Sequence, residues 1–309
     1  MGFRRGYNQN MRLPRPILLF FLLPVLMAHA ADGLLCGTWN LRWFPSGIAD
    51  CRGTDAEEAG REGEVGRFLQ SCLRSIESDE EKPLVLFFQE VRDATTCSNL
   101  VDAMGMDGLS VACVSDYRDQ AGFSIWQQDA VFTTLPVLEA HSVVWHSSRE
   151  DPLPRGYAYA LLDGGTNGPI AAFSIHLKSN LTASGLPREK QRAIFARERA
   201  ASEILAKLRS LRHVSNLRVV VGGDFNTDSA DGAFVSEKTL RSFYGAHFRS
   251  CFTDVKLEER ITHPASGGYP DATFDYILSR GFRRVTGRYL FPGKPYSDHN
   301  PVFVELPFP

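Results

Sequence analysis

Apolar runs along the chain predict its strands. The run at 84–88 is uninterrupted, which is typical of a strand buried on both faces, and the runs at 34–41 and 217–223 also have strand character. Residues 110–176 hold several short strand-like runs separated by Gly, Pro and Asp clusters. The last predicted strands span 274–278, 286–291 and 302–306.

Apolar residues at helical spacing predict helices between these strands. The first begins at Thr54, which can form a capping box with Glu57, and has an apolar stripe that runs to Ile76. Shorter helices are predicted from Asp93 to Met104 and around 236–247, and a long one over 187–211. Strands that alternate with helices, with hairpin-like strands between them, indicate a layered α/β fold with mixed sheets.

The first thirty residues have the pattern of a secretory signal peptide. Four arginines precede the apolar run 17–27, and Ala28-His29-Ala30 fits a small-x-small cleavage site, so we expect cleavage after Ala30. The run is short for a membrane span, which favours a secreted or periplasmic protein without a stable anchor. No linker or repeat divides residues 31–309, which predicts one domain.

Charge and cysteine content narrow the possibilities. The 34 basic and 36 acidic side chains give a net charge of −2, and removal of the four leader arginines leaves −6. The overall charge therefore does not indicate a nucleic-acid binder, although a local basic rim could serve one. Six cysteines in an exported chain favour disulfides, and fifteen pairings are open.

Polar residues fall where strand-like runs end. The run Val219–Val221 is followed by two glycines, which would let the chain turn sharply, and then by Asp224 and Asn226. A carboxylate and an amide held together suit a divalent cation and a phosphate. The other residues at run ends are Asn40, Glu90, His176, Asp275, Asp298 and His299. Each alone has a local explanation, such as a cap or a turn, but strand ends at one sheet edge converge into a single cleft.

A family resemblance accounts for this set. The segments that carry it are Thr38-Trp39-Asn40, Phe88-Gln89-Glu90-Val91, Ser174-Ile175-His176-Leu177-Lys178-Ser179, Gly223-Asp224-Phe225-Asn226, Phe274-Asp275-Tyr276-Ile277 and Ser297-Asp298-His299-Asn300-Pro301. In that order they resemble the endonuclease/exonuclease/phosphatase superfamily across almost the whole mature chain. The resemblance implies a four-layer sandwich, in which two mixed β-sheets pack face to face between outer helices, with the active site at one end.

The resemblance also implies how a phosphodiester would be hydrolysed. His299 would deprotonate a water molecule, with Asp275 holding its ring, and His176 would protonate the leaving oxygen. The opposite assignment of the two histidines stays open, because it depends on substrate polarity. Asp224 and Asn226 would orient the nucleophile and stabilise the oxyanion, or join a second metal site.

Metal binding is expected at Glu90, helped by Asp298 and with Asn40 nearby. The expected ion is Mg²⁺, with Mn²⁺ and Ca²⁺ as alternatives. These three residues follow the family pattern and form an oxygen-rich ligand set.

Two further residues are implied by the resemblance. Arg155 resembles the family's phosphate-contacting arginine, with a solvated strand-edge arginine as the alternative. Asp129 is placed like the carboxylate that supports the acid histidine in pancreatic-type deoxyribonucleases, although Gln127 or Gln128 could hold that position. The remaining histidines have no motif and are expected to be surface or core residues: His141, His146, His213, His247 and His263.

These features predict a secreted, monomeric, metal-dependent phosphodiesterase, with a nuclease acting on DNA or RNA as the leading interpretation. Two groups of basic residues could form the rim that such a substrate needs: Lys178, Arg188, Lys190, Arg192 and Arg197, and Arg280, Arg283, Arg284 and Arg288. The first group could instead be the solvated face of a helix. A sphingomyelinase or phospholipase C-type enzyme is the alternative, and an exported toxin subunit or binding module is the alternative of another class.

Overall fold

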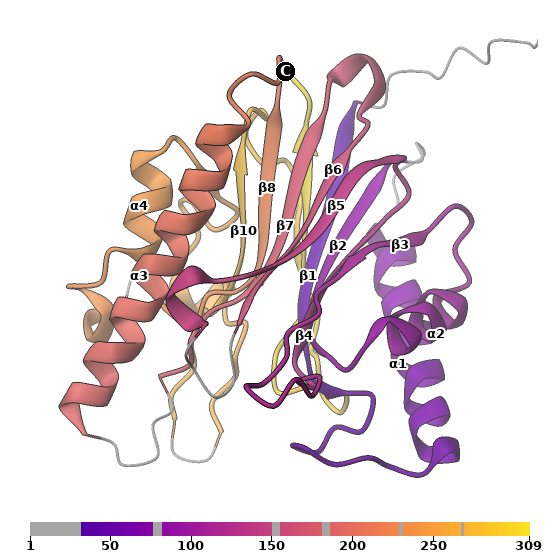
Figure 1. Ribbon diagram of the computed structural model, residues 1–309. Coiled ribbons are helices and arrows are strands. Elements are labelled where there is room, and N and C mark those ends of the chain that lie inside the picture. The colour runs from indigo at the N-terminus through magenta and orange to yellow at the C-terminus, as the bar shows by residue number, and fades with distance from the viewer. Residues whose placement is uncertain (1–31, 77–81, 150–154, 181–185, 229–230, 267–268) are drawn as a thin grey trace, which may run out of the picture.

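The computed structural model describes residues 32–76, 82–149, 155–180, 186–228, 231–266 and 269–309. The predicted signal peptide and its cleavage site lie outside the described residues. Two six-stranded mixed sheets pack face to face, in the orders β11-β12-β1-β2-β4-β3 and β5-β6-β7-β8-β10-β9 (Figure 1). This is the fold expected from the sequence.

All strands except the short one at Arg249–Ser250, which was not predicted, fall in predicted strand regions with small shifts in their bounds. The first sheet contains β1 (Gly33–Phe44), β2 (Leu84–Val91), β3 (Ser110–Val114), β4 (Gln128–Thr133), β11 (Arg288–Leu290) and β12 (Val302–Pro307). The second contains β5 (Val137–Val144), β6 (Gly156–Leu162), β7 (Ile170–His176), β8 (Arg218–Asp224), β9 (Arg249–Ser250) and β10 (Asp275–Arg280). β1 with β2, and β7 with β8, are parallel, and the other pairs are antiparallel.

Helices cover both outer faces and complete the four layers (Figure 1). α1 (Asp55–Ile76) and α2 (Ala94–Met104) lie on the first sheet, and α3 (Pro187–Ser210) and α4 (Thr239–Gly245) lie on the second. The predicted caps form: Thr54 and Glu57 bond each other reciprocally, and the Asp93 carboxylate accepts from the Thr96 amide at 2.8 Å. Within the described residues, no helix has the length and apolar character needed to span a bilayer.

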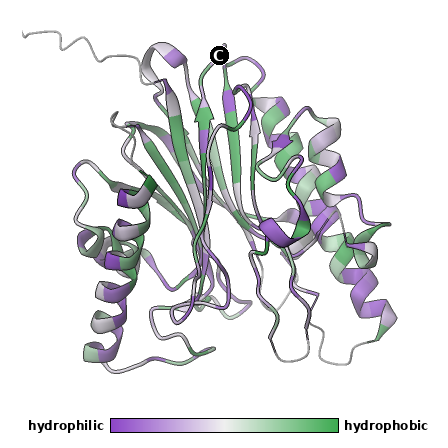
Figure 2. Ribbon diagram, turned by 180° about the vertical axis from the view of Figure 1, so that it is seen from behind, coloured by the Kyte–Doolittle hydropathy of each residue, from purple (hydrophilic) through white to green (hydrophobic). Residues whose placement is uncertain are grey.

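The core lies between the sheets and under the helices. Strand residues are mostly apolar, whereas the helices show a polar outer side (Figure 2). Two buried clusters form, one shared by the second sheet, α3 and the inner face of the first sheet, and one under α1 and α2. The continuous apolar run of β2 is buried on both faces, as its sequence predicted.

Two expectations need correction. Gly222 and Gly223 do not form a turn, because both lie inside β8 and pair with β7 and β10. A Cβ on Gly222 would lie 2.2 Å from the Phe87 ring of the facing sheet, and one on Gly223 would lie 1.9 Å from the Ile175 carbonyl oxygen, so these glycines permit close packing. The predicted disulfides are also absent, since all six cysteines are free and five of them are buried.

Candidate active site

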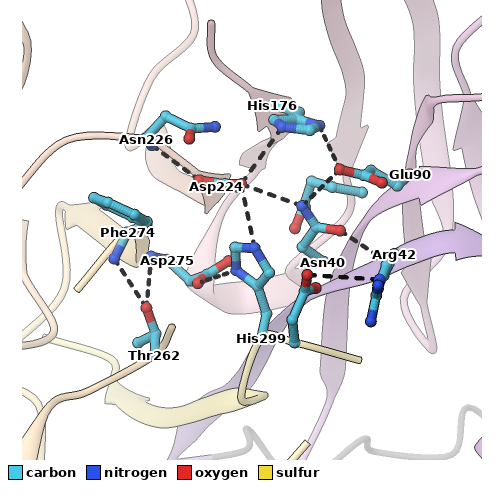
Figure 3. Close-up of polar contacts among 12 residues, drawn as sticks. Asn40, Arg42, Glu90, His176, Asp224, Asn226, Thr262, Phe274, Asp275 and His299 are labelled. Atoms are coloured by element: carbon cyan, nitrogen blue, oxygen red, sulfur yellow. Dashed lines mark hydrogen bonds and ion pairs between the residues drawn. The ribbon is translucent and has the colours of Figure 1, made fainter. Parts of the chain in front are cut away.

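Strand register brings three polar residues into one row. Asp224 ends β8 and pairs with His176, the last residue of parallel β7, and with Asp275, the first residue of antiparallel β10. All three are buried at one end of the sandwich, opposite the C-terminus marked in Figure 1. The convergence predicted from strand ends is therefore real, and Figure 3 shows the resulting cluster.

The Asp224 carboxylate lies between the two histidines (Figure 3). Its Oδ2 atom is 3.4 Å from Nε2 of His176 and 3.9 Å from Nε2 of His299. The backbone amide of Asn226 donates to the other oxygen at 2.9 Å. Burial raises the pKa of Asp224 to about 7, although nearby His299 opposes this shift. Two imidazoles thus face one point from different segments of the chain.

His299 is held by a chain of hydrogen bonds. Its Nδ1 lies 2.8 Å from Oδ2 of the fully buried Asp275. The Thr262 hydroxyl accepts from the backbone amides of Phe274 and Asp275, which fixes the start of β10 (Figure 3). Ser297 accepts from the His299 amide and donates to the Asn40 carbonyl, so the loop that carries His299 is tied to β1.

The two histidines have opposite pKa shifts. Burial and the neighbouring Arg155 guanidinium lower the pKa of His176 well below its usual value. Burial alone would lower the pKa of His299. The negative charges of Asp275, Asp224 and Asp298 outweigh the effect of burial and raise this pKa to about 10. Without a bound cation, these charges favour an imidazolium at His299 and a neutral ring at His176.

Glu90 enters the site from a β-bulge. The β2–β4 register shifts between Gln89 and Val91, and Glu90 adopts a left-handed φ of 59°. Its carboxylate accepts from the Trp43 amide at 3.1 Å and from the Asn40 side chain at 3.2 Å. The bulge turns the side chain toward the cluster, where Oε1 lies 3.8 Å from Nδ1 of His176.

Asn40 connects two acids of the site. Its Nδ2 also donates to Asp224 at 3.1 Å, and its Oδ1 accepts from the Arg42 amide. Asn40 therefore orients Glu90 and Asp224 with all its polar atoms engaged. Asp298, one third exposed, forms a 3.6 Å ion pair with Arg42 at the rim.

The donor set fits a divalent cation. Glu90 has no Lys or Arg ion pair among the described residues, yet it lies close to buried Asp224. Clustered carboxylates of this kind are balanced most simply by a cation. Ligand atoms of Asp224, Asp275 and His299 also lie within 4.8 Å of one another. In that second group, His299 and Asp275 are already engaged in a hydrogen bond with each other. The Glu90 side of the cluster is therefore the better place for the ion.

Asp129 was expected to support the acid histidine, His176, but it does not contact it. Its Oδ2 accepts from the Tyr117 hydroxyl at 2.7 Å, and no ion pair within 4 Å joins it to His176 among the described residues. Burial raises the Asp129 pKa to about 8, despite that hydrogen bond and the nearby Arg155. Arg155 does lie close to the site: Nη2 donates to Gln127 at 2.9 Å, and Nη1 is buried and has no hydrogen-bond partner among the residues that the structure describes.

The predicted basic rim is only partly present. Arg197 is fully buried, where it pairs with Glu237 and donates to the Lys178 carbonyl at 2.8 Å. In the second group, Arg280 ends β10, whose first residue is Asp275, and Arg283 and Arg284 follow it, so these three lie at the opposite end of the sheet, while Arg288 begins β11 of the other sheet. Lys178 and the exposed residues at the start of α3 remain available on the site side.

Two neighbours of the site were missed by sequence reasoning. The His263 ring packs edge-on against His299 with centroids 4.9 Å apart, although His263 has no motif around it. Thr262 lies thirteen residues before Asp275, and no local pattern marks it as its support. Both come from the segment before β10, whose return to the site depends on long-range pairing.

Comparison with known proteins identifies the family to which this chain belongs. Residues 37–299 match the endonuclease/exonuclease/phosphatase family, and the chain belongs to it. Members of this family are hydrolases that act on phosphoester bonds. A search of curated protein sequences found no match.

Solved structures share the fold at low sequence identity. An endonuclease/exonuclease/phosphatase from Beutenbergia cavernae DSM 12333 is 17% identical, with a TM-score of 0.62 over 90% of this chain and 72% of that one. A mannosyl-6-phosphatase from Bacteroides thetaiotaomicron VPI-5482 is 17% identical, with a TM-score of 0.59 over 89% and 100%. Sphingomyelinase C from Streptomyces griseocarneus is 17% identical, with a TM-score of 0.57 over 88% and 99%. At this identity the likeness concerns the fold.

Proposed function

We propose that this protein is an exported, divalent-metal-dependent phosphodiesterase that cleaves nucleic acid. The observation that carries the proposal is the position of Asp224 between two imidazoles, at 3.4 Å and 3.9 Å. A phosphoryl group beside Asp224 would have one imidazole available for the attacking water and another for the leaving oxygen. Hydrolysis of a phosphoester, a phosphodiester included, releases an alcohol whose oxygen must gain a proton, and this pair of imidazoles could supply both proton transfers.

Mg²⁺ is the proposed ion, with Mn²⁺ or Ca²⁺ as substitutes, and Glu90 and Asp298 would hold it. When bound, it would neutralise phosphoryl charge and make the phosphorus a better electrophile. Its charge would also offset the carboxylates that favour the His299 imidazolium, so His299 could accept a proton. We therefore keep the Asp275–His299 pair as the base and His176 as the acid.

Nucleic acid is favoured by the side chains around the cluster. Arg42, Arg155 and Lys178 supply positive charge beside the site. Trp126, on the loop that enters β4, is half-buried and lies 5.8 Å from the Arg52 guanidinium. An aromatic ring at the edge of an open site is a platform on which a base can stack.

Phospholipid hydrolysis is the second candidate, and one observation favours it. Several large apolar side chains are exposed on segments at the site end of the sandwich: Ile48, Phe123, Leu186, Val235, Leu257 and Tyr269. Apolar loop tips of this kind can enter a lipid surface. They come from separate segments of the chain, whereas Arg42 pairs with Asp298 and Arg155 lies beside His176, so we place nucleic acid first.

The test is hydrolysis of plasmid DNA, RNA and sphingomyelin vesicles with Mg²⁺, with and without EDTA. His176→Ala and His299→Ala should each reduce the rate by about 10²–10⁴-fold, whereas His213→Ala, on an exposed histidine after α3, serves as the matched control. Cleavage of sphingomyelin alone would replace the nuclease proposal with the lipid one. Rates that are equal in all three variants would contradict catalysis by this site.

A further inference from the structure

A groove opens between the free edges of the two sheets, beside the site. β3 and β5 are edge strands of different sheets, and the Asp116 amide after β3 donates to the Ser142 hydroxyl of β5 at 2.8 Å. The groove has a volume of about 480 Å³ and is lined by Asp116, Arg118, Ser142, Val143, Val144 and Arg149. We propose that it binds a backbone phosphate of the nucleic-acid substrate, away from the scissile bond, an inference that rests on the function proposed above.

Strand register sets the distance between groove and site. Val144 of β5 pairs with Gly156 of β6, and the next β6 residue pairs with Ile175 of β7, which precedes His176. Adjacent strands are about 4.8 Å apart, so the groove begins roughly 10 Å from His176. Phosphates on one DNA strand are spaced about 3.4 Å along the helix axis. The groove therefore lies within a few nucleotides of the scissile phosphate.

The lining has the chemistry of a sugar-phosphate site. Arg149 is exposed and has no hydrogen bond or ion pair in the part of the chain that the structure describes. Arg118 is also exposed, and its Nε pairs with Asp116 at 3.0 Å, a contact that is weak in solvent. Ser142 adds a hydroxyl group, and two valines give the groove an apolar wall suited to a sugar.

Arg155 links the groove to the catalytic cluster. It precedes β6, its carbonyl accepts from the Trp145 amide and from the Ser148 hydroxyl, and Ser148 is next to Arg149. Its guanidinium lies close enough to His176 to lower the pKa of that imidazole. Positive side chains thus extend from the site to the edge of the sandwich. On a chain of net charge −2, a polyanion needs a local positive region of this kind in order to bind.

The test is steady-state cleavage of single-stranded DNA oligonucleotides, from dinucleotides to about twelve nucleotides, in Mg²⁺ at several salt concentrations. Arg149→Ala and Arg118→Ala should each raise KM for the longest oligonucleotide about threefold to fivefold, with a smaller change in kcat. The slope of log KM against log salt should fall by about one per arginine. The loss should shrink as the oligonucleotide is shortened, because a dinucleotide does not reach the groove.

Arg283→Ala is the control, since Arg283 is an exposed arginine at the far end of β10. If Arg149→Ala matches this control at every length while the wild type cleaves DNA, the groove inference is wrong and the proposed function stands. If the wild type cleaves neither DNA nor RNA oligonucleotides of any length, both are wrong.

Discussion

Nδ1 of His299 and Oδ2 of Asp275 lie 2.8 Å apart, which couples the first residue of β10 to a loop 24 residues later. This contact directs the other ring nitrogen, Nε2, toward Asp224. We expect Asp275→Asn to lower kcat by about 10²–10⁴-fold, because the amide can neither stabilise the imidazolium nor enforce the tautomer. KM should change much less, and circular dichroism should show an intact fold. A kcat within about threefold of wild type would contradict the pairing.

Glu90 is expected to hold the divalent ion. Glu90→Gln removes the carboxylate charge with little change in shape, so Mg²⁺ should bind more weakly and stabilise the variant less against heat than the wild type. The measurement is the thermal unfolding temperature across a Mg²⁺ titration, which does not depend on activity. Glu64→Gln, on α1 and away from the cluster, is the control. Equal Mg²⁺ shifts in wild type and Glu90→Gln would place the ion elsewhere.

Gly223 permits the close approach of β8 and β7 next to the site. Its φ is +151°, and an added Cβ would lie 1.9 Å from the Ile175 carbonyl oxygen. Gly223→Ala should lower the free energy of unfolding by roughly 2–4 kcal/mol, measured by chemical denaturation. Gly232→Ala, with open space around the new Cβ, should change it by less than about 1 kcal/mol. Similar effects from both variants would refute the steric argument.

Arg197 and Glu237 form a buried pair, with Nε to Oε1 at 2.8 Å and both side chains almost fully shielded. Arg197→Ala leaves Glu237 buried without its cation, so the free energy of unfolding should fall by roughly 3–5 kcal/mol. The same change removes the donor to the Lys178 carbonyl, two residues after His176, and should reduce activity as well. Arg192→Ala, exposed on the same helix, should leave stability within about 0.5 kcal/mol.

Asp129 should give stability a dependence on pH. Burial raises its folded-state pKa to about 8, above its unfolded value, so the folded protein retains a proton that the unfolded chain releases. Its contribution to stability is fully present below about pH 4 and is lost as pH rises toward 8. Asp129→Asn should flatten this slope in denaturant titrations between pH 4 and 8 in EDTA, whereas the exposed Asp102→Asn should not. An unchanged slope in Asp129→Asn would contradict the assignment.

Local patterns in the sequence determined most of the elements. The uninterrupted apolar run before Gln89 can only be shielded between two layers, and the helical stripe before Ile76 can only be shielded on one face. The caps at Thr54 and Asp93 depend on residues three positions away, so they too were predictable. The prediction of disulfides from the cysteine count was wrong, because an even number of thiols does not establish that any two lie within bonding distance.

The polar residues that gather at this end of the sandwich were named from the sequence, because most of them directly follow strand-like apolar runs. The contacts among them were decided only by the tertiary structure. Asp224 meets His176 and Asp275 through strand register, and His263 reaches His299 from a segment with no motif. Arg197 has the same local sequence signal as a solvated arginine, yet it is buried against Glu237. Periodicity reports which side of an element is shielded, whereas distances between elements depend on how the layers pack.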